Sequence, residues 1–181
     1  TAGKLVYMGG TAALGGDSTA SFEFDDLFSS TYHYYRINCS FAMSSAGDDL
    51  WMQWRSDGSN ITSGDYRYLQ DWTNMTSSSV VSASTSYSGT NNTYMILGEN
   101  MSGALTEMSS FTIDVYQPMT TGCHTACMIT GLVYQTNGTT TMTTSNCWYN
   151  GEAGDIDGFR FLTSASSISY REAQVWAFDS T

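Results

Sequence analysis

Positive charge, histidine and proline are all scarce in this chain of 181 residues. It holds six lysines and arginines together, two histidines and one proline, against 17 acidic residues, and its formal net charge is −11. So acidic a chain is poorly suited to bind the phosphate backbone of a nucleic acid or an anionic membrane. The two histidines, His33 and His124, form no Ser-His-Asp pattern that exceeds coincidence among so many serines.

Long apolar runs are missing as well. No stretch approaches the roughly 18 consecutive apolar residues of a membrane-spanning helix, so we expect no insertion into a bilayer. The first residues, "TAGKLVYMGG", lack the charged lead and uninterrupted apolar block of a signal peptide. Glycine-rich pieces such as "MGGTAALGG" lack the lysine of a phosphate-binding loop. We therefore expect no nucleotide site.

Cysteine is sparse and unevenly spaced, at Cys39, Cys123, Cys127 and Cys147. The segment from Cys123 to Cys127, with a histidine between them, hints at metal binding. A structural zinc site needs two tight ligand pairs, however, and the other two cysteines are distant singletons. The spacing favours buried free thiols or, in an oxidising environment, a disulfide from Cys123 or Cys127 to Cys147.

Hydroxyl and aromatic side chains are abundant instead. Serine and threonine make up more than a quarter of the chain, aromatic residues 14% and charged residues only 13%. The aromatic content supplies enough burial for a folded core, so the composition is not that of a disordered chain. A length of 181 residues fits one domain.

Alternation of apolar and polar residues dominates the pattern. In "LWMQWR", Leu50, Met52 and Trp54 fall on one face and Trp51, Gln53 and Arg55 on the other. Segments 32–43 and 49–56 flank a polar turn and predict an antiparallel pair. Similar segments lie at 65–72, 92–100, 109–118, 126–136 and 140–150 and in the final 25 residues. We therefore predict an all-β fold, an antiparallel, jelly-roll-like β-sandwich of about 8–10 strands.

The chain shows no linker between domains. Residues 1–20 are rich in small residues and predict an extended N-terminal arm around one short strand, Lys4 to Met8, while residues 21–181 predict a single sandwich domain. The serine-rich segment 76–92 is interpreted as a strand and a long loop.

Candidate binding residues are few. Asp155 and Asp157 share a strand face between two glycines and could hold a calcium ion, although solvated turn acids explain them more simply. No other cofactor is expected. Trp51, Arg55 and Trp72 are the candidate residues for contact with a ligand or partner, because Trp51 lies on the polar face of its strand.

Several segments resemble a pattern that recurs in structural proteins of tailed bacteriophages. The pattern is a "Y-x-x-Y-x-I" strand, a polar turn, a strand ending in "R-x-S-x-D-G-S" and then "S-x-x-Y". Its residues here are Tyr32, Tyr35, Ile37, Leu50, Met52, Arg55, Ser56, Asp57, Gly58, Ser59 and Tyr66. "FTIDVYQP" fits a middle strand, and "DIDGFRFLTSASSISYREAQVWAF" resembles a closing hairpin. The similarity covers about half of the chain, but the cysteines and the serine-rich segment depart from it.

The resemblance implies a non-enzymatic protein on the virion surface. It implies a sandwich subunit, a homotrimer in contact with other virion proteins, used as a short appendage or for capsid decoration with a part in host attachment. It carries over no catalytic residue. The alternatives are a tail-fibre receptor-binding domain or a carbohydrate-binding module whose exposed tryptophans and tyrosines bind a host-surface glycan. A hydrolase ranks below these, because each carboxylate pair is adjacent in sequence.

Overall fold

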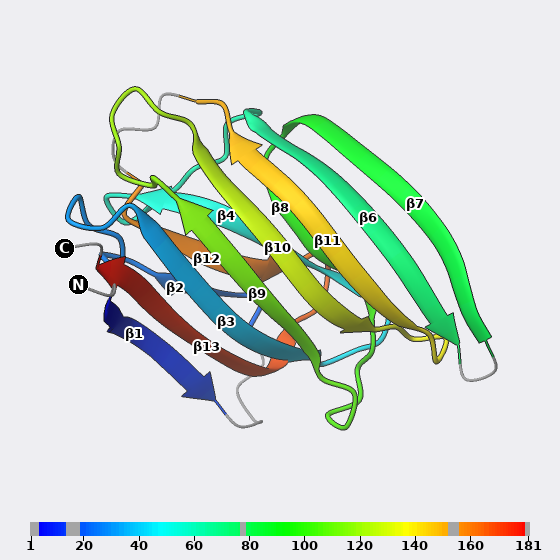
Figure 1. Cartoon of the computed structure of the whole chain (residues 1–181). Helices are drawn as coiled ribbons and strands as arrows, with labels where there is room; N and C mark the ends of the chain where they lie inside the picture. Colours follow the sequence, from blue (N-terminus) through cyan, green and yellow to red (C-terminus); the bar gives the residue numbers. More distant parts are fainter. Residues whose placement is uncertain (1–3, 14–18, 77–78, 152–155, 180–181) are drawn as a thin grey trace.

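The chain folds into two antiparallel β-sheets packed face to face (Figure 1). The computed structural model describes residues 4–13, 19–76, 79–151 and 156–179, with the backbone alone at 12, 13, 76 and 79–90. These described residues form thirteen strands and no helix, and therefore no helix that could cross a membrane. The predicted β-sandwich is confirmed, with more strands than the 8–10 expected.

The larger sheet has eight strands in the order β1, β13, β3, β9, β10, β11, β6, β7. Their bounds are β1 Lys4–Ala13, β13 Ile168–Asp179, β3 Tyr34–Met43, β9 Ser109–Tyr116, β10 Thr125–Tyr134, β11 Thr140–Tyr149, β6 Tyr66–Thr76 and β7 Ser79–Asn92. The smaller sheet has the order β2, β12, β4, β5, and β8 also pairs with β4. Its bounds are β2 Ser21–Phe24, β12 Gly158–Thr163, β4 Asp48–Ser56, β5 Ser59–Asn60 and β8 Met95–Met101.

The core fills the space between the sheets. Successive side chains of a strand point to opposite faces, so alternate apolar residues enter the interior from both sides. Leu50, Met52 and Trp54 of β4 are fully buried, as the alternation predicted. They meet Tyr35 and Phe41 of β3 within one continuous apolar cluster. Burial of this aromatic-rich cluster is the main favourable contribution to folding.

The predicted pairing of segments 32–43 and 49–56 is wrong. β3 pairs with β13 and β9 in the larger sheet, whereas β4 pairs with β12, β5 and β8 in the smaller one. The connection therefore crosses the sandwich instead of turning within one sheet. Alternation gives the same signal in both cases, because a strand buries every second residue whether its neighbour in sequence lies beside it or across the core.

The closing segment is not a hairpin either. β12 lies beside β4, and β13 lies beside β3, so the β12–β13 connection also crosses between sheets. The two crossings run next to each other: the backbone N–H of Ser44 donates to the carbonyl of Ser167 at 2.8 Å, and the N–H of Asp49 donates to Oγ of Ser164 at 3.1 Å. The resemblance motifs thus form two adjacent arches that join the sheets.

The expected N-terminal arm lies largely in the larger sheet. β1 extends to Ala13, beyond the short strand predicted for Lys4 to Met8, and it pairs along β13 from Lys4–Asp179 to Ala13–Arg171. Met8 packs against the core. The backbone of β7 likewise pairs with β6 over the serine-rich segment, where a strand and a long loop were expected.

Deleting residues 1–13 should remove the partner of β13 and lower the melting temperature of the protein. β13 then loses its ladder with β1, which runs from Lys4–Asp179 to Ala13–Arg171, and its N–H and C=O groups on that side are left unpaired. A synthetic peptide of residues 4–13 should raise the melting temperature again by adding the strand in trans. A truncated protein with an unchanged melting temperature would contradict this account.

Candidate functional site

The outer face of the eight-stranded sheet carries a hollow of about 470 Å³. Its floor consists of small polar side chains from three neighbouring strands, and its sides come from β13 on one hand and from β10 and β11 on the other. The floor residues are Asn38, Ser40, Ser110, Thr112 and Thr130, and the sides are Glu172 and Gln174 opposite Leu132 and Met142. The hollow is therefore a feature of the rigid sheet and not of a loop.

Strand register places these residues in two rows. Asn38, Thr112 and Thr130 are direct partners across β3, β9 and β10, and Gln174 of β13 pairs with Asn38. The second row, one outward position further along, joins Glu172, Ser40, Ser110, Leu132 and Met142. Because directly opposed residues share a face of a sheet, both rows project outward together.

Hydrogen bonds use only part of this polar surface. Oγ1 of Thr112 donates to Oδ1 of Asn38 at 3.2 Å, and Nε2 of Gln174 donates to Oε1 of Glu172 at 3.2 Å. Within the described part of the chain, no hydrogen bond joins the hydroxyls of Ser40, Ser110 or Thr130 to another residue. The hollow thus presents hydroxyl and amide groups that are available to a ligand.

Two aromatic side chains, Tyr7 and Trp176, lie on the same face, on the side of the hollow formed by β13. Tyr7 of β1, 54% exposed, contacts Trp176 with ring centroids 5.1 Å apart. A second depression of about 130 Å³, lined in part by Tyr7 and Gly10, shares Glu172 and Gln174 with the hollow. A Cβ at Gly10 would lie 2.4 Å from the backbone carbonyl oxygen of Ala173 and 2.8 Å from the Tyr7 hydroxyl oxygen, so glycine there permits the close approach of β1 to β13.

The neighbouring row holds a neutralised charge pair. Nε of Arg36 donates to Oδ1 of Asp114 at 2.7 Å, and the Tyr34 hydroxyl donates to the same carboxylate. Burial raises the pKa of Asp114, but hydrogen bonds from Arg36 and Tyr34 outweigh burial and leave it below the usual range. Burial, followed by the bond to Asp114, raises the pKa of Tyr34 to about 12. This border therefore adds no net charge to the hollow at neutral pH.

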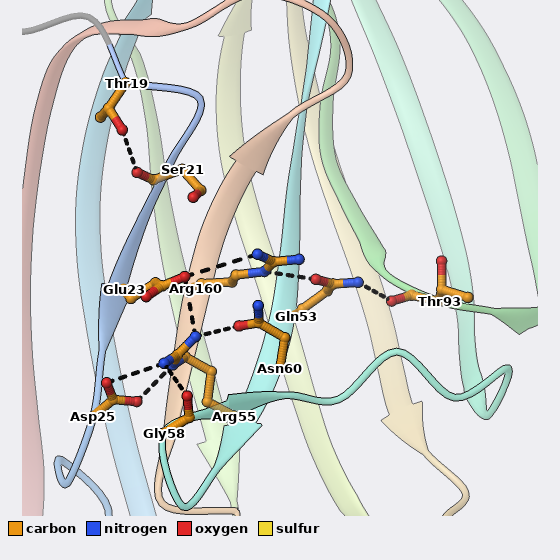
Figure 2. A network of polar contacts seen from close by, with 10 residues as sticks. All are labelled: Thr19, Ser21, Glu23, Asp25, Gln53, Arg55, Gly58, Asn60, Thr93 and Arg160. Atoms are coloured by element: carbon orange, nitrogen blue, oxygen red, sulfur yellow. Dashed lines mark hydrogen bonds and ion pairs between the residues drawn. The ribbon is translucent and has the colours of Figure 1, made fainter.

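Arg55, a predicted contact residue, lies instead in a polar network on the smaller sheet (Figure 2). Its side chain is only 5% exposed. Nε donates to Oδ1 of Asp25 at 2.6 Å, Nη2 donates to the carbonyl of Gly58 at 2.7 Å, and Nη1 donates to Asn60 and lies 3.1 Å from Glu23. The bond to Asp25 is the largest of the effects that raise the pKa of Arg55. Its hydrogen-bond donors are engaged with groups of the chain itself. Through Glu23 and Asn60 they join β4 to β2 and β5.

The network continues across the sheet through Arg160. Nε of Arg160 donates to Oε1 of Gln53 at 2.7 Å, and Nε2 of Gln53 donates to the carbonyl of Thr93 at 2.6 Å. Arg160 also lies 3.8 Å from Glu23. Charged and amide groups from β2, β12 and β4 are thereby fixed to one another, and they hold the smaller sheet together on its outer face.

The two predicted tryptophans do not belong to one site. Trp51 lies on the outer face of the smaller sheet and stacks on Tyr94, with ring centroids 4.0 Å apart and planes 8° from parallel. Trp72 belongs to the larger sheet and is 5% exposed, because it continues the inward alternation of Tyr66, Tyr68 and Gln70. Of the three candidate contact residues, Trp72 and Arg55 are thus buried, and Trp51 stays a prediction.

The predicted calcium ligands are only half described. Asp155 lies outside the described residues. Oδ2 of Asp157 accepts a hydrogen bond from the backbone N–H of Asp57 at 2.9 Å, and burial raises the pKa of Asp157. Among the described residues, no cluster of three or more His, Cys, Asp or Glu side chains could hold a metal ion. The Asp157 carboxylate thus serves the turn at Asp57.

All four cysteines are free thiols. Cys39, Cys127 and Cys147 are buried, and Cys127 lies directly opposite Cys147 in the register of β10 and β11. A hydrogen bond with Cys127, together with burial, raises the pKa of Cys147 well above its ordinary value, and burial alone raises that of Cys39. The sequence left open buried free thiols or a disulfide to Cys147, and in the structure the thiols are free.

A thiol-reactive dye should modify the native protein at Cys123 first. The other three thiols are buried, and the thiolate is the reactive form. Mass spectrometry of the labelled protein should show one rapid modification, followed by three more on addition of denaturant. Rapid native labelling of Cys127 or Cys147 would mean that the sheet opens between β10 and β11.

Comparisons with known proteins supply no family. No protein-family model matches the chain, and no curated protein matches it. Among solved structures, the chain has a distant likeness to one titled "Crystal structure of infectious bursal disease virus VP2 subviral particle", with 7% identity and a TM-score of 0.13. The match covers 98% of this chain and 40% of that one. A TM-score this low carries no argument about fold or function.

Proposed function

We propose that this chain is a non-enzymatic structural protein on the surface of a tailed-bacteriophage virion, a short appendage or capsid-decoration subunit with a part in host attachment. The observation that supports this proposal most directly is where the resemblance motifs lie. Their residues form the scaffold of the sandwich and leave its broad outer sheet face for contacts.

The segment "RSDGS", residues 55–59, illustrates the point. Arg55 is buried among its carboxylate partners, and Asp57 and Gly58 both have positive φ, 48° and 70°, as the tight turn between β4 and β5 requires. Phe159 and Phe161, from the closing motif, are fully buried. A shared motif of this kind preserves a fold while the exposed residues remain free to suit a particular particle or host.

The edge strand β1 is a candidate contact with neighbouring subunits. Leu5 and Tyr7 are half exposed on the outermost strand of the larger sheet, which has β13 on one side and no described strand on the other. Apolar side chains on an open edge favour association with another chain. This edge would join the subunit to other virion proteins or to further copies, and a homotrimer is our expectation.

Labelling of intact particles tests the proposal. A gold-tagged antibody against the chain should label the particle surface in negative-stain images, and mass spectrometry should give the copy number per particle. Hundreds of copies with head labelling would indicate decoration, and a few dozen or fewer with tail labelling would indicate an appendage or fibre. If purified particles contain none of the chain, the proposal is wrong.

A further inference from the structure

We infer that the hollow on the outer face of the eight-stranded sheet binds a neutral oligosaccharide. The inference gives the proposed attachment role a ligand class and rests on that role for its biological meaning, whereas the binding itself is a property of the isolated chain. The volume of about 470 Å³ falls within the roughly 300–1,000 Å³ of small-molecule sites.

The polar groups of the hollow match the chemistry of a sugar. Sugars present hydroxyls that both donate and accept, and the hollow offers groups of the same kind, the hydroxyls of Ser40, Ser110 and Thr130 and the amides of Asn38 and Gln174. These side chains stand on paired strands, so they are positioned before a ligand arrives. Binding then requires little ordering of the protein.

Apolar surface flanks the polar floor at both ends. Leu132 and Met142 form one side, and Tyr7 lies beyond the opposite side, next to the depression that shares Glu172 and Gln174. A sugar ring has apolar C–H faces that pack on such surfaces while its edge hydroxyls reach the floor. The alternation of apolar and hydroxyl-bearing surface suits a chain of sugar rings better than one compact apolar ligand.

Electrostatics favour a neutral ligand over an acidic one. Glu172 is the one charged residue among the twelve that line the hollow, and the chain carries a net charge of −11. An anionic glycan would be repelled both locally and by the overall charge. An extended peptide fits less well, because strand addition needs an open edge, whereas the backbone groups of β3, β9 and β10 are paired on both sides.

Titration calorimetry on the purified full chain tests the inference. The probes are neutral tetrasaccharides and hexasaccharides built from glucose, galactose, mannose or N-acetylglucosamine, with uronic-acid and sialylated oligosaccharides as acidic comparators. At least one neutral probe should bind saturably, with an affinity that changes little with added salt, and acidic comparators should bind more weakly. If no neutral oligosaccharide binds, or if the acidic oligosaccharides bind more tightly, the inference is wrong.

Variants locate the site. Asn38→Ala and Gln174→Ala each remove an exposed amide and should weaken binding about tenfold, as loss of a ligand hydrogen bond does. Thr130→Trp should fill the floor and abolish binding. Asn146→Ala is the matched control, because Asn146 is exposed on the same face but does not line the hollow. Binding that survives the first three changes lies elsewhere, and the assignment is then wrong.

The two proposals fail in different ways. If antibody labels the virion surface and no neutral probe binds, the glycan inference alone is refuted. If a probe binds with the expected variant pattern and particles lack the chain, the virion proposal alone is refuted.

Discussion

Replacing Trp54 by alanine should lower the free energy of unfolding by about 3–5 kcal/mol, the usual cost of truncating a buried large aromatic ring. Trp54 is fully buried and packs near Phe28, with ring centroids 6.2 Å apart. Because side chains in a close-packed core shift little, most of the space left by the ring remains a cavity. Urea unfolding of the purified protein measures the loss, which is a large part of a typical domain's stability of about 5–15 kcal/mol.

Trp51→Ala is the matched comparison, because Trp51 is three positions away on the same strand and on the other face. Its removal forfeits the stack on Tyr94, an interaction of about 0.5–1.5 kcal/mol beyond burial, and opens no cavity in the core. We expect well under half of the Trp54 effect. If Trp51→Ala destabilises more, the two faces of β4 have been assigned the wrong way round.

Arg55→Ala should be the most damaging change among the charged residues. It leaves Asp25 without its cation, leaves Glu23 with Arg160 alone at 3.8 Å, and frees the carbonyl of Gly58 in a site where the arginine side chain is 5% exposed. Breaking a buried pair costs about 3–5 kcal/mol, and because both carboxylates are 40% exposed and regain water, we expect the lower end. The smaller sheet should loosen first, with faster hydrogen exchange in β2 and β5.

Arg36→Ala is the control, because it also removes an arginine from a carboxylate pair, but from an exposed one. Arg36 also pairs with a carboxylate, Asp114, but its side chain is 41% exposed on the outer face of the larger sheet. Exposed pairs contribute about 0–1 kcal/mol, so urea unfolding should change little. Equal losses for Arg36→Ala and Arg55→Ala would show that burial does not set the strength of these pairs.

Alternation in the sequence predicted the buried faces well and the sheets poorly. Leu50, Met52 and Trp54 point inward as expected, because period-two patterning reports burial directly. It does not report which strands are neighbours, so it predicts β3 and β4 side by side although they lie in different sheets. The two-residue β5 left no pattern of its own to detect.

The candidate site was harder to predict for a related reason. Asn38, Thr112 and Thr130 come from three strands, and an outward-facing serine or threonine looks the same in sequence whether it lines a hollow or an open surface. Trp72 and Arg55 were candidates for contact with a ligand or partner, but Trp72 is buried and Arg55 is paired with carboxylates of the same chain. The available signal was the pair of hydroxyls at alternate positions of β9, Ser110 and Thr112, and only the order of the strands places them beside Asn38 and Thr130.

The pairing of the first strands with the last has a consequence during synthesis. Among the described strands, β2 pairs only with β12 and β1 only with β13, so a nascent chain carries both without their partners until Gly158 and the residues after it leave the ribosome. At about 5–20 residues per second, the wait from Phe24 to Gly158 lasts roughly 7–27 s. Folding of the sandwich must then wait for β12 and β13, and a chain cut short before β12 would keep two unpartnered apolar strands, which makes premature termination an aggregation hazard.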